Sequence, residues 1–92
     1  MPTVHVRITG RVQGVGYRAW TVEHASRAGL TGWVRNRSDG SVEAVLQGSE
    51  TTIEAFLARC QEGPRFAKVY SVTTESIEKS EIFSDFTHKT TL

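Results

Sequence analysis

Residues 31–47, TGWVRNRSDGSVEAVLQ, decide the fold because they combine two strand-like segments with a tight turn. The turn is Ser38-Asp39-Gly40, and an Asp-Gly pair between two strands favours a short hairpin connection. The strands predicted on either side cover residues 31–37 and 41–47. In the second strand, one face carries the alternating apolar side chains of Val42, Ala44 and Leu46. The centre of the chain is therefore predicted to be an antiparallel hairpin.

Before this hairpin, the pattern predicts one strand and one helix. Residues 3–9 alternate, with Val4, Val6 and Ile8 on one side and polar residues on the other, which is typical of a half-buried strand. From about residue 17 to residue 28, the spacing becomes helical, and Gly29 stands where a glycine commonly ends a helix. A glycine-rich loop, residues 10–16, joins the two.

After the hairpin, the pattern predicts a second helix and two more strands. Ser49 is a good N-cap, and Gly63-Pro64 ends the helix that follows it. The apolar stripe of this helix consists of Ile53, Phe56, Leu57 and Cys60. Residues 68–77 are predicted to form a strand, and residues 83–91 a weaker one.

The order strand, helix, strand, strand, helix, strand, with an extra C-terminal strand, predicts an α+β fold. Two helices on one face of a mostly antiparallel sheet form the ferredoxin-like, split βαβ arrangement. The chain has 92 residues, so we expect a single domain over residues 1–92.

The composition of the chain indicates which binding partners and which cellular location to expect. The net charge is +1 from interleaved signs, so binding to nucleic acid is not expected. Cys60 is the only cysteine, which excludes an internal disulfide. No segment resembles a signal peptide or is long enough to cross a membrane. We therefore expect a cytoplasmic monomer without a membrane partner.

The loop between the first strand and the first helix has the composition of an anion site. Its glycines, Gly10, Gly14 and Gly16, let successive backbone N–H groups point inward at the positive end of a helix dipole. Arg18 follows in the first helical turn, where its guanidinium can hold two phosphate oxygens. The loop residues predicted to bind phosphate are Val12, Gln13, Gly14, Val15, Gly16 and Tyr17. A tight turn beside a surface arginine is the alternative.

Two other phosphate-binding motifs do not fit this loop. A P-loop would end in Gly-Lys-Ser or Gly-Lys-Thr, which is absent. Residues 14–19 match the G-x-G-x-x-A dinucleotide pattern, but that fold needs several parallel strands and an acidic residue at a strand end. The acidic residue at about the right distance, Asp39, lies in the hairpin turn, and the chain is too short.

Two segments together resemble the acylphosphatase family. Residues 10–18, GRVQGVGYR, resemble its first signature, and residues 32–48, GWVRNRSDGSVEAVLQG, resemble its second. The resemblance implies hydrolysis of small acyl phosphates to a carboxylate and phosphate, without a metal, a cofactor or a covalent intermediate. It also implies that Arg18 and the loop amides hold the phosphate, and that Asn36 positions the attacking water.

The physical chemistry of the residues agrees with this resemblance. An acyl phosphate already has a good leaving group, so the enzyme mainly needs to hold charge and orient water. Asn36 offers a donor and an acceptor but is not a useful base. We expect its strand to run beside the first strand and so to bring Asn36 towards Arg18. An ordinary strand-end asparagine is the alternative interpretation.

The chain departs from the family pattern at two positions. Gly16 replaces a residue that is bulkier in many members, and His88 stands where an aliphatic residue is expected in the last strand. His5, His24 and His88 are scattered over different elements, so none is expected to be catalytic or to bind a metal. Trp20 and Cys60 are expected in the core, and Trp33 on the open face of the sheet.

Two other functions stay open on the sequence alone. Ferredoxin-like domains also bind single-stranded RNA through aromatic residues on the sheet, although Trp33 stands nearly alone here. A non-catalytic regulator that binds acyl phosphates would keep the same loop. The sequence also leaves the natural substrate open among acetyl phosphate, carbamoyl phosphate and bisphosphoglycerate, because all three contain the same anhydride.

Overall fold

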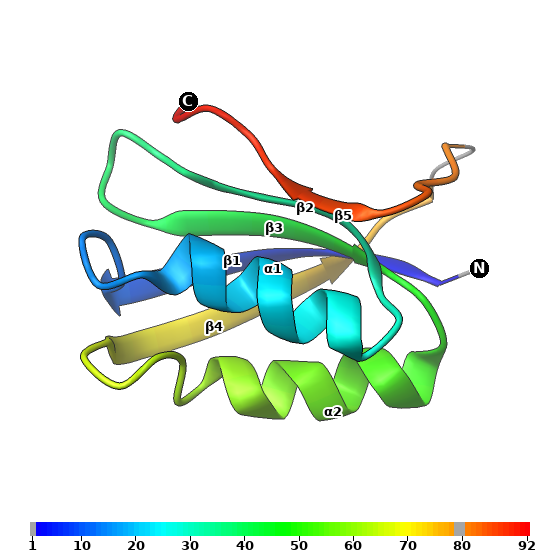
Figure 1. Ribbon diagram of the computed structural model, residues 1–92, viewed down its shortest axis with the longest axis horizontal. Helices are drawn as coiled ribbons and strands as arrows, with labels where there is room; N and C mark the ends of the chain where they lie inside the picture. Colours follow the sequence, from blue (N-terminus) through cyan, green and yellow to red (C-terminus); the bar gives the residue numbers. More distant parts are fainter. Residues whose placement is uncertain (1, 79–80) are drawn as a thin grey trace.

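The computed structural model describes residues 2–78 and 81–92, and its elements follow the predicted order (Figure 1). They are β1 (Thr3–Arg11), α1 (Tyr17–Arg27), β2 (Thr31–Asn36), β3 (Val42–Gln47), α2 (Glu50–Cys60), β4 (Lys68–Ser76) and β5 (Phe86–His88). The predicted ferredoxin-like α+β class is confirmed.

The sheet has the strand order β4-β1-β3-β2-β5, and both helices cover the same face of it (Figure 1). Three strand pairs are antiparallel, whereas β2 and β5 are parallel. One expectation is wrong: β2 does not lie beside β1, because β3 lies between them and pairs with both. The crossover through α1 leaves space for one strand between β1 and β2, and β3 of the hairpin occupies that space.

The core lies between the helices and the covered face of the sheet. The sheet contributes Val6, Ile8, Val34, Val42, Ala44 and Leu46, all 2% exposed or less. The inward positions of the helices are Tyr17, Thr21 and Ala25 on α1, and Ile53, Phe56 and Cys60 on α2. Trp20 stacks on Phe56 between the two helices, with ring centroids 5.9 Å apart. The predicted core positions of Trp20 and Cys60 are confirmed, and burial raises the pKa of the Cys60 thiol to about 11.

The last strand is shorter than predicted. The sequence pattern predicts a strand over residues 83–91, but β5 covers only Phe86–His88 and pairs with Gly32–Val34 of β2. Phe86 is the only buried residue of β5, so little apolar burial is available to extend the strand. Beyond it, single hydrogen bonds continue the contact with β2, from Lys89 N to Val34 O at 2.8 Å and from Leu92 N to Asn36 O at 3.1 Å.

The open face of the sheet carries a buried carboxylate, Glu43 on β3, whose side chain is 7% exposed. His5 Nε2 and Arg35 Nε each lie 2.6 Å from one of its oxygens, and Arg37 Nη1 lies 3.2 Å away. Burial alone would raise the pKa of Glu43, but the hydrogen bonds with His5 and Arg35 outweigh it and lower this pKa to about 2. Glu43 thus links three strands and the hairpin turn.

Glu43→Gln is expected to lower the free energy of unfolding at pH 7 by about 2 kcal/mol. A fall in pKa from 4.5 to about 2 corresponds to roughly 3 kcal/mol, and solvent reduces this because Arg35 and Arg37 are 24% and 26% exposed. Since the folded pKa is the lower one, this stability is complete above about pH 4.5 and is lost as pH falls through about 2. Urea unfolding at neutral and acidic pH measures it. A difference between the two proteins that does not change with pH would contradict this account.

Candidate active site

The predicted phosphate-binding residues, 12–17, form the connection from β1 into the start of α1, which lies at the same end of the sheet as the β2–β3 hairpin (Figure 1). The core fixes both ends of this loop, because Val12 and Tyr17 are each 1% exposed. The Tyr17 hydroxyl donates a hydrogen bond to the Cys60 backbone oxygen at 2.8 Å, which ties the start of α1 to the end of α2. Burial raises the pKa of Tyr17, so this hydroxyl stays protonated and is not a base.

Gln13 fixes the middle of the loop against the hairpin. Its Nε2 donates to the backbone oxygens of Arg37 and Ser41, at 2.7 and 2.8 Å. The sequence pattern predicts Gln13 only as a loop residue and gives no sign of this bridge, because residues 13 and 37–41 come together only in the folded chain. The side chain of Gln13 therefore places the loop beside the strand end that carries Asn36.

The backbone of the loop presents free donors. Gly14 and Gly16 have φ values of +74° and +81°, a conformation that favours glycine although an added Cβ would meet no atom within 4 Å. Within residues 2–78 and 81–92, no group accepts a hydrogen bond from the amides of residues 13–18. Gly16 caps α1 without a side-chain hydrogen bond. Several unpaired N–H groups thus meet the positive end of the helix dipole.

A cavity of about 240 Å³ opens over this loop and contains both predicted catalytic side chains, Arg18 and Asn36. Its lining residues are Val12, Gln13, Gly14, Gly16, Tyr17, Arg18, Ala19, Asn36 and His88. Val15 is the exception among the predicted loop residues. It lines a separate hollow with Arg11, Arg65, Phe66 and Lys68 and does not line the cavity.

Asn36 lies in the cavity as expected, although its strand is not beside β1. Adjacent positions on a strand alternate between faces, and Val34 lies in the core under the helices. Asn36, two residues later, is therefore on the same helix-covered side, at the end of β2 next to α1. The pairing of the loop with the hairpin through Gln13 brings Asn36 and Arg18 together, without any pairing between β1 and β2.

His88 also lines the cavity, although the sequence pattern offers no reason to place a histidine there. That none of the histidines is catalytic or binds a metal stays a prediction. In the parallel pairing of β2 and β5, His88 is in register with Val34. The histidine in place of an aliphatic residue was visible in the sequence, but only the parallel pairing places it beside β2, the strand that carries Asn36. His5 and His24 lie elsewhere, bonded to Glu43 and Arg59.

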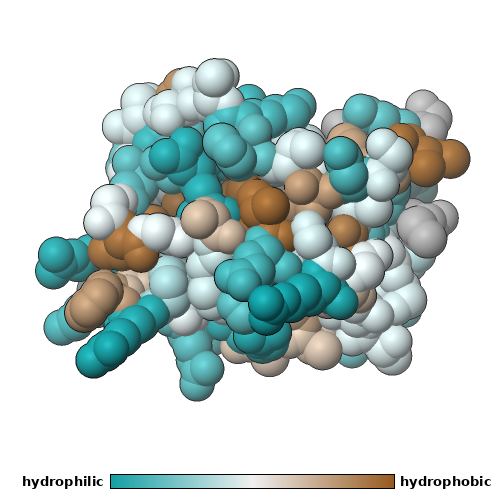
Figure 2. All heavy atoms as spheres, in the orientation of Figure 1, coloured by the Kyte–Doolittle hydropathy of each residue, from teal (hydrophilic) through white to brown (hydrophobic). Residues whose placement is uncertain are grey.

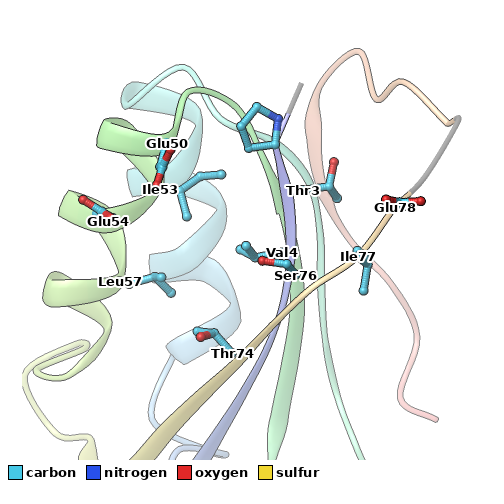
Figure 3. A pocket seen from close by; sticks show the side chains of 11 residues that line it. Thr3, Val4, Glu50, Ile53, Glu54, Leu57, Thr74, Ser76, Ile77 and Glu78 are labelled. Atoms are coloured by element: carbon cyan, nitrogen blue, oxygen red, sulfur yellow. The ribbon is translucent and has the colours of Figure 1, made fainter.

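A larger hollow lies elsewhere and is not suited to phosphate. It has a volume of about 920 Å³ and lies between α2, the end of β4 and the start of β1 (Figure 3). Its charged lining residues are Glu50, Glu54 and Glu78, whose carboxylates would repel a dianion. The smaller cavity over the loop is lined by Arg18 and by no carboxylate, so its charge is the one that attracts phosphate.

The sequence of this chain is similar to those of known proteins. The family model described as Acylphosphatase matches residues 4–88. The chain belongs to the acylphosphatase family. It is 61% identical over 70 residues to an acylphosphatase of Rhodopseudomonas palustris, covering 76% of this chain and 71% of that one. An acylphosphatase of Rhizobium etli is 49% identical over 83 residues, covering 90% and 88% of the two chains.

The fold of the acylphosphatases is also the fold of this chain. The crystal structure of the Bacillus subtilis acylphosphatase superposes with a TM-score of 0.93 at 32% identity, covering 97% of this chain and 99% of that one. The chain is therefore an enzyme that hydrolyses acyl phosphates.

The described part of the chain shows no sign of a membrane-spanning helix or a metal site. On the face covered by the helices, Figure 2 shows mostly hydrophilic side chains, with apolar atoms in small separate patches. No helix within the described ranges is long and apolar enough to span a membrane. Within those same ranges, no group of three His, Cys, Asp or Glu side chains is close enough to hold a metal ion.

Proposed function

We propose that the cavity over the loop is the catalytic site, in which Arg18 and the amides of the loop hold the phosphoryl group of a small acyl phosphate. The observation that supports this most is the set of unpaired amides of residues 13–18 beside Arg18, in a cavity without a lining carboxylate. Backbone N–H groups at a helix N-terminus suit the oxygens of phosphate, and the guanidinium adds a two-pronged contact. Together they stabilise the charge that develops in the transition state.

Asn36 is proposed to orient the attacking water. Its amide both donates and accepts, so it can hold a water molecule in line with the bond that breaks. The water oxygen attacks phosphorus, the bond between phosphorus and the acyl oxygen breaks, and the electron pair leaves with the carboxylate. A phosphate oxygen of the substrate takes the water proton, so the products are a carboxylate and inorganic phosphate. No lining side chain needs to act as a base.

The open face of the sheet does not favour the RNA-binding alternative. Trp33 lies on that face as predicted, but it is only 8% exposed, and Arg35 and Lys89 both lie 4.8 Å from its ring centroid. A buried ring does not offer a surface on which a base can stack. The absence of a nucleic-acid partner, the monomeric state, the cytoplasmic location and the single domain over residues 1–92 stay predictions.

Release of inorganic phosphate from acetyl phosphate tests the function, and the same assay with EDTA tests the metal-free mechanism. We expect turnover in both conditions, because Arg18 and the loop amides supply the positive field. A non-catalytic binding protein would release no phosphate above the spontaneous rate. Loss of turnover with EDTA, restored by Mg²⁺ or Zn²⁺, would contradict the mechanism but not the activity. Carbamoyl phosphate in the same assay begins to define the substrate range.

A further inference from the structure

His88 occupies the outer end of the catalytic cavity. It lies on β5, the edge strand, one strand beyond Asn36 on β2. Neighbouring strands lie about 5 Å apart, so His88 is about one strand spacing further from the end of β1 than Asn36 is. Phe86, two residues earlier on β5, is buried in the core under the helices, which puts His88 on the same side of the sheet as the cavity.

Most polar groups that line the cavity already have a proposed role or a hydrogen-bond partner. The loop amides and Arg18 are assigned to the phosphoryl group, and Asn36 to the water. The Gln13 side chain already donates to the Arg37 and Ser41 oxygens, and the Tyr17 hydroxyl to Cys60. His88 is the lining side chain left without a described hydrogen-bond partner or an assigned task. His88 is exposed, so it lies where the cavity opens to solvent.

We propose that His88 binds the acyl group and favours acyl phosphates that carry a second anionic group, such as the monophosphates of dicarboxylic acids. This inference rests on the proposed function. An imidazole N–H donates a hydrogen bond, and a protonated imidazole adds a positive charge, which an aliphatic side chain at this place would lack. No carboxylate lines the cavity to compete for that donor.

Binding explains His88 better than proton transfer does. The leaving group is a carboxylate, which is stable as an anion at neutral pH and needs no proton from a general acid. His88 is therefore a substrate-binding residue. A change in the ratio of kcat/KM values for two substrates distinguishes this role from a purely structural one.

The test compares kcat/KM for succinyl phosphate and acetyl phosphate in the parent, His88→Ile and His88→Gln. We expect the ratio of the two values to fall about tenfold in His88→Ile, because a hydrogen bond to a charged group is lost. His88→Gln keeps a donor and should retain part of the preference. Thr87→Val, on the same strand but on the opposite face, is the matched control and should keep the parent ratio.

The outcomes separate this inference from the proposed function. A parent that hydrolyses both substrates, with a ratio that His88→Ile and His88→Gln leave unchanged, would overturn the role of His88 alone. An equal fall for both substrates, with a lower melting temperature, would make His88 a structural residue and would also overturn it. A parent that releases phosphate from neither substrate would overturn the proposed function, and this inference with it.

Discussion

Arg18→Ala is expected to remove nearly all hydrolysis of acetyl phosphate and to weaken inhibition by inorganic phosphate. Arg18 is the charged side chain of the cavity, half-buried in the first turn of α1 next to the unpaired loop amides. Loss of a charged, two-pronged contact to phosphate should cost about 2–4 kcal/mol, or roughly thirty- to a thousandfold in kcat/KM. Phosphate inhibition should weaken because the same contact binds the product.

Two further variants sharpen this test. Arg18→Lys should also be poor, because an ammonium group is a point charge and cannot hold two oxygens in one plane. Arg27→Ala, at the other end of α1, removes an exposed ion pair with Glu23 at 3.1 Å and should leave the kinetics unchanged. If Arg18→Ala retains the parent inhibition constant for phosphate, Arg18 is not the phosphate ligand.

Asn36→Ala is expected to lower kcat by about 10²–10³, with phosphate inhibition nearly intact. The cost corresponds to about 2.7–4 kcal/mol, as for other preorganised polar groups that act mainly in the transition state. The phosphate contacts remain, because they come from the loop and from Arg18. Packing should also remain, since the Asn36 backbone oxygen keeps its bond from Leu92 N.

Asn36→Asp distinguishes water orientation from general base catalysis. A base at this position would preserve or raise the rate when asparagine becomes aspartate. If the side chain only orients water, the new negative charge beside a dianionic phosphate should repel the substrate and lower the rate further. Ser38→Ala, an exposed change in the same hairpin, is the matched control. An Asn36→Asp enzyme as active as the parent would overturn the assigned role, as would an Asn36→Ala enzyme that keeps kcat but loses phosphate affinity.

Local sequence patterns predicted most of the fold because they act over short distances. The Asp39-Gly40 turn, the alternation at Val4, Val6 and Ile8, and the N-cap at Ser49 each specify one element without help from the rest of the chain. The glycines of the loop likewise set the backbone that exposes the amides, since their positive φ values are a local property. The last strand is shorter than predicted, and Phe86 is its only buried residue.

Which residues form the site depends on contacts between segments that are far apart in the sequence. The two-signature resemblance named Arg18 and Asn36, but the strand order and the Gln13 bridge decide how they meet, and neither was predicted. The placement of His88 depends on the parallel pairing of β5 with β2, between segments more than fifty residues apart. The sequence by itself thus determined the elements, the anion loop and the family. Only the tertiary structure decided which side chains share the cavity, because strand order and register are set by burial of the whole sheet under two helices.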